Sequence, residues 1–284
     1  MAGFVRKVQA LPLVDRDRLA QAWSSVVLVA RVIYAIIIRE TRTRYGSSEL
    51  GYAWAIIDPL VELTVLVLLF TAFGRVSPIP VTLPVFLTSG IVPYSFFKNC
   101  MSRGASAASA NAALLTYPQV KISDVVLGRV ILEFVTTACV YVFFIFVLRF
   151  LDNEPLTSWQ DRPLPMFLAI AGLFYVGLCG AFFSSSMTRL TPVWGNIWSY
   201  ASRPLWFLSG IFFSLSSLPT GPRRYMTYNP LAHLLEWFRS DTLNQFESDH
   251  FSPIFVIVCF TVALGIGLSV DRMLTLVGHT ESDH

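Results

Sequence analysis

The sequence predicts an all-α polytopic membrane protein with six transmembrane helices, an N-terminal interfacial helix and short re-entrant helices before the last span. Composition is the first reason. Hydrophobic residues make up 54% of the 284 residues and charged residues 14%, against about 25% charged residues in an average soluble domain. The distribution of charge is the second reason, because the charges gather in clusters between apolar runs long enough to cross a bilayer.

Six apolar runs reach the length of about 20 residues that a spanning helix needs. They are residues 52–73, 83–101, 124–150, 164–187, 193–214 and 252–271. An even number of spans puts both termini on one side. If that side is the cytoplasm, 14 of the 21 Lys and Arg residues lie in inside segments and 6 in outside segments, as the positive-inside rule favours. The chain then divides into a cytoplasmic N-terminus with its interfacial helix (1–50), a six-span domain (51–276) and a cytoplasmic tail (277–284).

The segment before the first span predicts a helix in the membrane interface. Its apolar run, 26–38, has 13 residues and contains Arg31, so it is too short to cross but suits an amphipathic interfacial helix. The basic cluster 39–45 follows at the level of the lipid headgroups. One interpretation is a simple polybasic anchor. The other is that this helix also receives a partner protein.

Two further segments lack the character of spans. Residues 101–121 are rich in Ala and Ser and predict a weakly amphipathic cytoplasmic helix whose small side chains permit close packing. Residues 216–243, on the outer side, are interrupted by Pro219, Pro222 and Pro230. Re-entrant helices fit this segment, since irregular backbone at membrane depth must be covered by protein or water.

Charged residues inside the predicted spans are candidates for a substrate path. Asp58 and Glu62 lie four residues apart on one face of the first span, and Arg203 lies near the middle of the fifth. A charge at the bilayer centre costs about 2.5–3.5 kcal/mol, so such groups face protein or water. Two interpretations stay open. Arg203 forms a structural ion pair with Glu62 or Asp58, or these groups line a hydrated path.

Aromatic residues lie in the same spans, with Tyr94 in the second and Trp198 and Trp206 in the fifth. Their apolar faces can stack on sugar rings and tolerate sliding, because the contact is weakly directional. Ordinary helix packing is the alternative for each of them.

Motifs for energy conversion or catalysis are missing from the sequence. It contains no G-x-x-x-x-G-K-[ST] loop for ATP and no Cys or His pair with metal-ligand spacing. We therefore expect no catalytic residue and no metal site, and the basic residues beside apolar runs do not suggest a nucleic-acid partner. A membrane-embedded sugar transferase would need carboxylate clusters on a cytoplasmic loop, where Asp124 stands nearly alone. A secondary transporter is a third class, although no internal repeat is visible.

The stretch IIIRETRTRYGSSELGYAWAIIDPL (36–60) resembles the ABC-2 exporter permeases, and in particular the capsular-polysaccharide export permeases. The similarity continues in LPVFLTSGIVPYSFF (83–97), TYPQVKISDVVLGRVILE (116–133), RPLWFLSGIFF (203–213) and YNPLAHLLEWFR (228–239). These segments follow the order of that family over most of the chain. The first twenty residues and the loop 149–163 do not contribute.

The resemblance implies a permease subunit of an ATP-driven exporter, a multi-pass protein of the bacterial inner (cytoplasmic) membrane with both termini cytoplasmic. It implies a homodimer that pairs with two copies of a cytoplasmic ATPase, which would bind ATP-Mg while this chain binds no cofactor. A lipid-linked capsular polysaccharide, a periplasmic polysaccharide co-polymerase or adaptor, and membrane lipids complete the expected partners. A permease for O-antigen or teichoic acid, from the same superfamily, is the alternative.

The resemblance also implies three groups of functional residues. ATPase coupling would involve Arg39, Glu40, Arg42, Arg44, Tyr45, Arg103 and Asn111. The substrate path, in a dimer channel lined by the first and fifth spans, would involve Asp58, Glu62, Arg203, Trp198, Trp206 and Tyr94. The outer re-entrant region would contribute His233, Glu236, Trp237 and Arg239. An acidic polymer would favour positive potential near the exit, from Arg223, Arg224 and Arg239.

Overall fold

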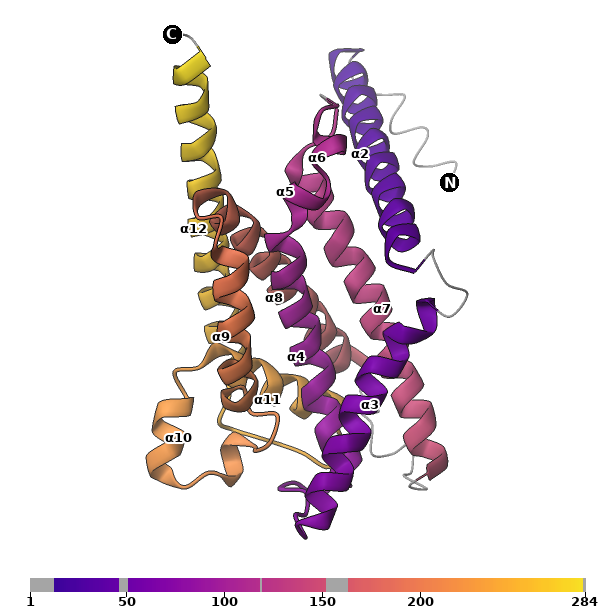
Figure 1. Ribbon diagram of the computed structural model, residues 1–284, viewed down its shortest axis with the longest axis vertical. Coiled ribbons are helices and arrows are strands. Elements are labelled where there is room, and N and C mark those ends of the chain that lie inside the picture. Colours follow the sequence, from indigo (N-terminus) through magenta and orange to yellow (C-terminus); the bar gives the residue numbers. More distant parts are fainter. Residues whose placement is uncertain (1–12, 46–50, 118, 152–162, 283–284) are drawn as a thin grey trace.

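The chain folds into helices and connecting loops. The computed structural model describes residues 13–45, 51–117, 119–151 and 163–282, and within these ranges it contains eleven α-helices, one 3-10 helix and no strand. The elements in chain order are α2 (Leu13–Tyr45), α3 (Gly51–Ala72), α4 (Leu83–Ala105), α5 (Ala107–Ala110), α6 (Ala112–Leu115), α7 (Ile122–Leu151), α8 (Pro163–Leu190), α9 (Trp194–Leu208), η2 (Leu215–Ser217), α10 (Thr220–Met226), α11 (Pro230–Thr242) and α12 (Pro253–Ser282). The all-α prediction is confirmed (Figure 1).

Three of the described helices have the length and apolar composition needed to cross a membrane. They are α7 over Ile122–Phe150, α8 over Pro163–Leu190 and α12 over Pro253–Leu276. The predicted first, second and fifth spans correspond to α3, α4 and α9, which carry the charged residues Glu62, Lys98 and Arg203. The count of six spans therefore stays a prediction.

Helix α9 is shorter than the predicted fifth span, 193–214. It has 15 residues, or about 22 Å of helix, against a hydrocarbon thickness of about 30 Å. The helix ends at Leu208, and Gly210 then adopts a left-handed conformation with φ +93°. Glycine suits this φ because it has no Cβ. Apolar composition did not reveal the turn, because the apolar run continues past it to Phe213.

Helix α4 lies at the centre of the bundle and packs against α8, α7, α11, α9 and α3 (Figure 1). Glycines let α4 and α8 approach closely. A Cβ on Gly104 of α4 would lie 2.2 Å from the carbonyl oxygen of Ala181 on α8, and one on Gly177 of α8 would lie 2.4 Å from the Phe96 ring. Such close packing matters in a bilayer, where lipid tails remove the hydrophobic drive between helices.

Gly104→Ala is expected to lower the thermal unfolding temperature of the purified protein, because the added methyl group meets backbone that cannot rotate away. Overpacking of this kind costs about 1–3 kcal/mol. The matched control is Gly265→Ala in α12, where an added Cβ has no neighbour within 4 Å, and where the helix propensity of Ala favours the variant by up to about 1 kcal/mol. Equal unfolding temperatures for the two variants would contradict the close α4–α8 contact.

The two ends of the bundle carry different elements. In Figure 1, α5, α6 and the C-terminal end of α12 lie at the upper end, whereas α10 and the connection between α3 and α4 lie at the lower end. Helix α2 packs along α7, where Ile36 of α2 is buried and a Cβ on Gly128 of α7 would lie 3.1 Å from it. Residues 1–12 and 46–50 of the predicted N-terminal segment and residues 283–284 of the predicted tail lie outside the described residues.

The boundaries of three predicted segments differ from those expected. Helix α2 extends over 33 residues, well beyond the apolar run 26–38. The stretch 101–121 is not one helix, because α4 continues to Ala105 and the one-turn helices α5 and α6 follow. The region 216–243 consists of short pieces, η2, α10 and α11, and residues 231–239 of α11 are all buried.

Candidate functional site

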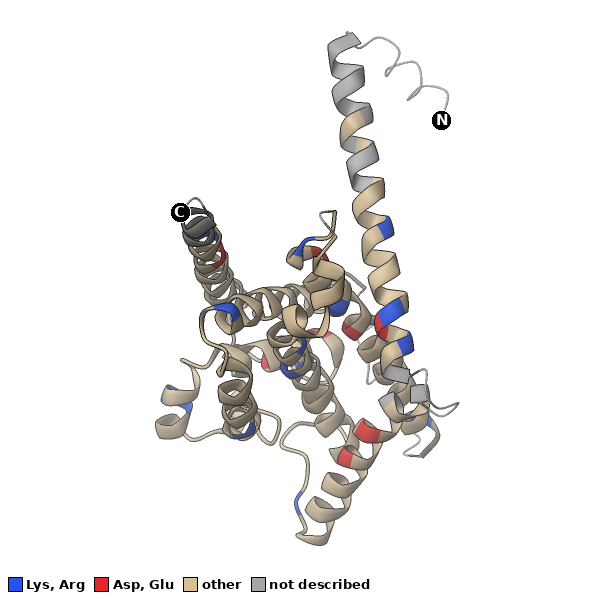
Figure 2. Ribbon diagram, turned by 45° about the horizontal axis from the view of Figure 1, so that its top comes forward, with Lys and Arg blue, Asp and Glu red and all other residues tan. Residues whose placement is uncertain are grey.

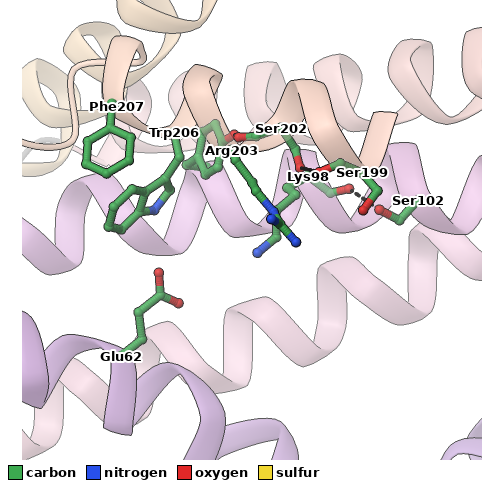
Figure 3. A pocket seen from close by; sticks show the side chains of 9 residues that line it. Glu62, Lys98, Ser102, Ser199, Ser202, Arg203, Trp206 and Phe207 are labelled. Carbon is green, nitrogen blue, oxygen red and sulfur yellow. Dashed lines mark hydrogen bonds between the residues drawn. The ribbon is translucent and has the colours of Figure 1, made fainter. Parts of the chain in front are cut away.

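A polar groove of about 540 Å³ lies between α3 and α9, with α4 behind it (Figure 3). Its lining residues are Glu62 from α3, Tyr94, Lys98 and Ser102 from α4, and Ser199, Ser202, Arg203, Trp206 and Phe207 from α9. A second pocket of about 370 Å³ adjoins it and shares Glu62 and Lys98. Asp58 lines this second pocket. The groove thus brings together four of the six predicted path residues, and Asp58 lies beside it.

Helical spacing explains how the groove is built. On α9, Ser199, Ser202, Arg203 and Trp206 follow the i, i+3, i+4, i+7 pattern of one helix face. Lys98 follows Tyr94 by four residues on α4, and Glu62 follows Asp58 by four residues on α3. The sequence analysis did not single out Lys98 as a path residue, although it lies within the predicted second span. Its spacing from Tyr94 is the signal that could have revealed it.

Opposite charges face each other across the groove without forming an ion pair. Figure 3 shows Glu62 on one wall, with Arg203 and Lys98 on the other. Among the described residues, no ion pair within 4.0 Å joins Arg203 to Glu62 or Asp58. The structural ion pair considered from the sequence is therefore absent in this conformation. The charged groups are open to a polar ligand that enters between the walls.

Two aromatic residues fix α9 to α4. The Tyr94 hydroxyl donates a hydrogen bond of 2.5 Å to the carbonyl oxygen of Ser202. The Trp198 indole donates one of 3.3 Å to the carbonyl oxygen of Lys98 and packs edge-on against Phe97 at 5.8 Å. Trp198 is buried and does not line the groove. Its place in the structure is that of a packing residue between the two helices.

An aromatic cluster borders the groove beyond Arg203. Trp206 lies edge-on to Phe212, with ring centroids 4.7 Å apart, and Phe212 contacts Phe70 of α3 at 5.4 Å. The Arg75 guanidinium donates to the carbonyl oxygen of Phe212 at 3.0 Å and lies over Phe70. The groove thus combines charged walls with an aromatic border.

A buried arginine joins the predicted coupling residues at the upper end of the bundle. Arg129 of α7 pairs with Glu40 of α2 at 3.1 Å and donates hydrogen bonds of 3.0 Å to the Arg103 carbonyl and the Ser106 hydroxyl. We call this set the Arg129 network. Arg129 is 3% exposed. The sequence analysis missed it as a functional residue, although an arginine near the start of an apolar span was a usable signal.

Most of the predicted coupling residues lie in or near this network. The Arg39 guanidinium donates to the Asn111 amide oxygen at 3.0 Å, which ties α2 to the α5–α6 turn. Arg42 is exposed on the same helix. The side chains of Arg44 and Tyr45 lie outside the described part of the chain.

Arg239 of α11 has a different role from the one expected. It was predicted to give positive potential near an exit, but it is 0% exposed. Its guanidinium donates four hydrogen bonds, to Ser89 Oγ and to the carbonyl oxygens of Gly210, Ile211 and Phe213. It also lies 4.2 Å from the centre of the Phe86 ring. We call this arrangement the Arg239 clamp. Because the guanidinium is buried and each of its three nitrogens donates to a protein acceptor, Arg239 is not available to a polymer.

The other predicted residues of α11 are also engaged within the protein. His233 accepts from the Ser252 amide at 3.1 Å through Nδ1, so the other ring nitrogen, 2.9 Å from the Thr227 carbonyl oxygen, is the donor. Glu236 accepts hydrogen bonds from the hydroxyls of Ser214 and Ser248. These contacts make α11 a scaffold that holds the connections on both sides of it.

Metal binding finds no support in the described residues, which contain no group of three His, Cys, Asp or Glu side chains that could hold an ion.

Comparison with known proteins gives a family and several relatives. Residues 31–243 match the family described as ABC-2 type transporter. The polysialic acid transport protein KpsM of Escherichia coli is 30% identical over 247 residues, covering 84% of this chain and 92% of KpsM. The capsule polysaccharide export inner-membrane protein CtrC of Neisseria meningitidis is 28% identical, covering 87% and 92%. The O-antigen export system permease protein RfbA of Klebsiella pneumoniae is 27% identical, covering 75% and 82%.

Proposed function

The chain belongs to the ABC-2 type transporter family, and on that basis we propose that it is the permease subunit of an ATP-driven exporter of lipid-linked capsular polysaccharide. Relatives that cover most of the chain are named for transport of capsular polysaccharide or polysialic acid. The O-antigen relative covers less of it. The capsular substrate is therefore favoured, and an O-antigen substrate is the alternative.

The polar groove is the observation that carries the transport mechanism. It collects a carboxylate, two cations, three serines and an aromatic border on the three helices α3, α4 and α9. Inside a membrane, charged groups of this kind face protein or water and mark substrate pathways. We assign α3, α4 and α9 to the walls of the substrate path, with a second copy of the chain completing it.

The remaining parts of the proposal follow from this assignment. We propose six spans, formed by α3, α4, α7, α8, α9 and α12, with both termini in the cytoplasm. The Arg129 network and the exposed face of α2 would then receive two copies of an ATPase, which supplies the ATP-Mg chemistry. The end with α10 would face the periplasmic adaptor. The arrangement of α5, α6 and the end of α12 at one end of the bundle supports this orientation (Figure 1).

Glu62→Gln and Arg203→Ala, made singly and together, test the groove. Neither side chain forms an ion pair with any residue in the described part of the chain, so both variants are expected to fold normally. Loss of one charge-assisted contact to the substrate would weaken its binding by roughly ten-fold or more. We expect export of glycolipid in vesicles that also contain the ATPase to fall accordingly, with the amount of inserted permease unchanged.

Two results would count against the proposal. Normal export by the double variant would remove the groove from the path. Export that continues when the ATPase is disabled would indicate a secondary transporter. The exposed Arg272 of α12 supplies the matched control, since Arg272→Ala removes an arginine that lines no part of the groove.

A further inference from the structure

A second groove lies between α8, α11 and α12 and shares no residue with the polar groove. We call it the outer groove. Its volume is about 690 Å³, within the usual range of about 300–1,000 Å³ for ligand sites. The walls are mainly apolar and include Leu164, Leu168, Ala171 and Ile257. Because α8 and α12 are two of the helices able to cross a membrane, the groove opens on a surface that meets lipid chains.

A polar pocket of about 480 Å³ continues from the outer groove. The two share Pro165, Asp241 and Phe251. The charged residues that line the polar pocket are Asp241, Glu247 and Asp249, and no Lys or Arg is among its described lining residues. The apolar outer groove thus leads directly into the polar pocket with its acidic residues, and the Asp241 carboxylate lies at the junction of the two.

The junction is held in place by packing. A Cβ on Gly172 of α8 would lie 2.3 Å from the Trp237 ring, so glycine is needed for the indole to enter between α8 and α11. The Trp237 indole donates to Asp241 Oδ2 at 2.8 Å. Burial raises the pKa of the Asp241 carboxyl, and the Trp237 hydrogen bond partly opposes that rise. A cation beside Asp241 would stabilise its ionised form further.

We propose that the outer groove binds a phospholipid with an amine headgroup, phosphatidylethanolamine, with an acyl chain against its apolar walls and the ammonium beside Asp241. Charge complementarity selects this occupant. An ammonium is attracted to the acidic residues that line the polar pocket, whereas a headgroup with a net negative charge is repelled by them. The same repulsion keeps an acidic polymer out, which separates this site from the substrate path. Placement in the outer leaflet rests on the proposed function, but lipid binding itself does not require transport.

Native mass spectrometry of the purified permease tests the proposal directly. The protein is incubated with equal amounts of phosphatidylethanolamine and phosphatidylglycerol that have the same acyl chains. We expect the amine lipid to be retained about ten-fold better, as one charge-assisted contact allows. Asp241→Asn should reduce its retention to the level of phosphatidylglycerol, and Asp241→Glu should restore the preference. Leu168→Trp, which fills the outer groove, should reduce retention of both lipids.

Equal retention of the two lipids by the wild-type protein would overturn the proposal, because it would show an apolar groove without headgroup selection. An unchanged preference in Asp241→Asn or full retention in Leu168→Trp would also overturn it. Thermal unfolding of each variant shows that a loss of binding is not a loss of fold. The lipid-binding experiment contains neither ATPase nor glycolipid. A protein that prefers phosphatidylethanolamine there but does not export glycolipid in the vesicle experiment would therefore contradict only the proposed function.

Discussion

Replacing Arg239 with leucine is expected to prevent the permease from reaching a stable folded state. The substitution removes four hydrogen bonds and leaves the carbonyl oxygens of Gly210, Ile211 and Phe213 buried without this donor. A buried polar group that loses its partner costs about 1–3 kcal/mol, and whole domains are stable by only about 5–15 kcal/mol. The measurement is the yield of monodisperse protein extracted from membranes, followed by its thermal unfolding temperature.

Two further variants separate the geometry of the clamp from its charge. Arg239→Lys should give almost as low a yield of folded protein as Arg239→Leu, because a single ammonium cannot reach acceptors that lie around a planar guanidinium. Arg224→Leu should give normal yields, since Arg224 is exposed on the neighbouring α10. A wild-type unfolding temperature for Arg239→Leu would show that the Arg239 clamp contributes little to the fold.

Arg129→Ala is expected to abolish coupled export while leaving an inserted permease. The change breaks the pair with Glu40 of α2 and the hydrogen bond from α7 to the Arg103 carbonyl at the end of α4. Removal of one partner from a buried pair costs about 3–5 kcal/mol. This is enough to change the equilibrium constant for docking of α2 by two orders of magnitude or more. With the proposed ATPase in the same vesicles, we expect ATP hydrolysis to persist and glycolipid export to fall below a tenth of normal.

One control for this prediction keeps a positive charge at position 129, and the other removes an arginine elsewhere. Arg129→Lys retains a cation but not the forked donor geometry, so export should be partial. Arg272→Ala, at an exposed position of α12, should export normally. Undiminished export by Arg129→Ala would mean that the link between α2 and α7 plays no part in coupling.

The helical fold was predictable from the sequence, because apolar runs long enough to span a membrane must satisfy their backbone hydrogen bonds internally, as helices do. The runs around α7, α8 and α12 are long and apolar, and all three meet the criteria for a span. The boundaries of the other helices were less predictable. The end of α9 depends on the backbone of Gly210, which the surrounding apolar residues hide. The length of α2 depends on its packing against α7, which a local pattern does not contain.

The groove residues could be found from the sequence in part, because a charge inside an apolar run stands out. Glu62 and Arg203 were identified in this way and line one groove. Lys98 and Arg129 were missed, because cations near the ends of spans look like ordinary topology signals. The role of Arg239 could not be predicted, since its acceptors on residues 89 and 210–213 are distant in sequence and most are backbone carbonyls.

The Arg239 clamp also sets an order of events during biosynthesis. Ser89 leaves the ribosome 150 residues before Arg239 does, so α4 is made long before the guanidinium that will bind it exists. Until then, the carbonyl groups after α9 have to be satisfied by water or by the insertion machinery. The contact closes only when α11 turns back onto helices that are already in place. Completion of the part of the bundle that contains α11 is therefore a late step, and a chain that stops before residue 239 lacks the group that completes it.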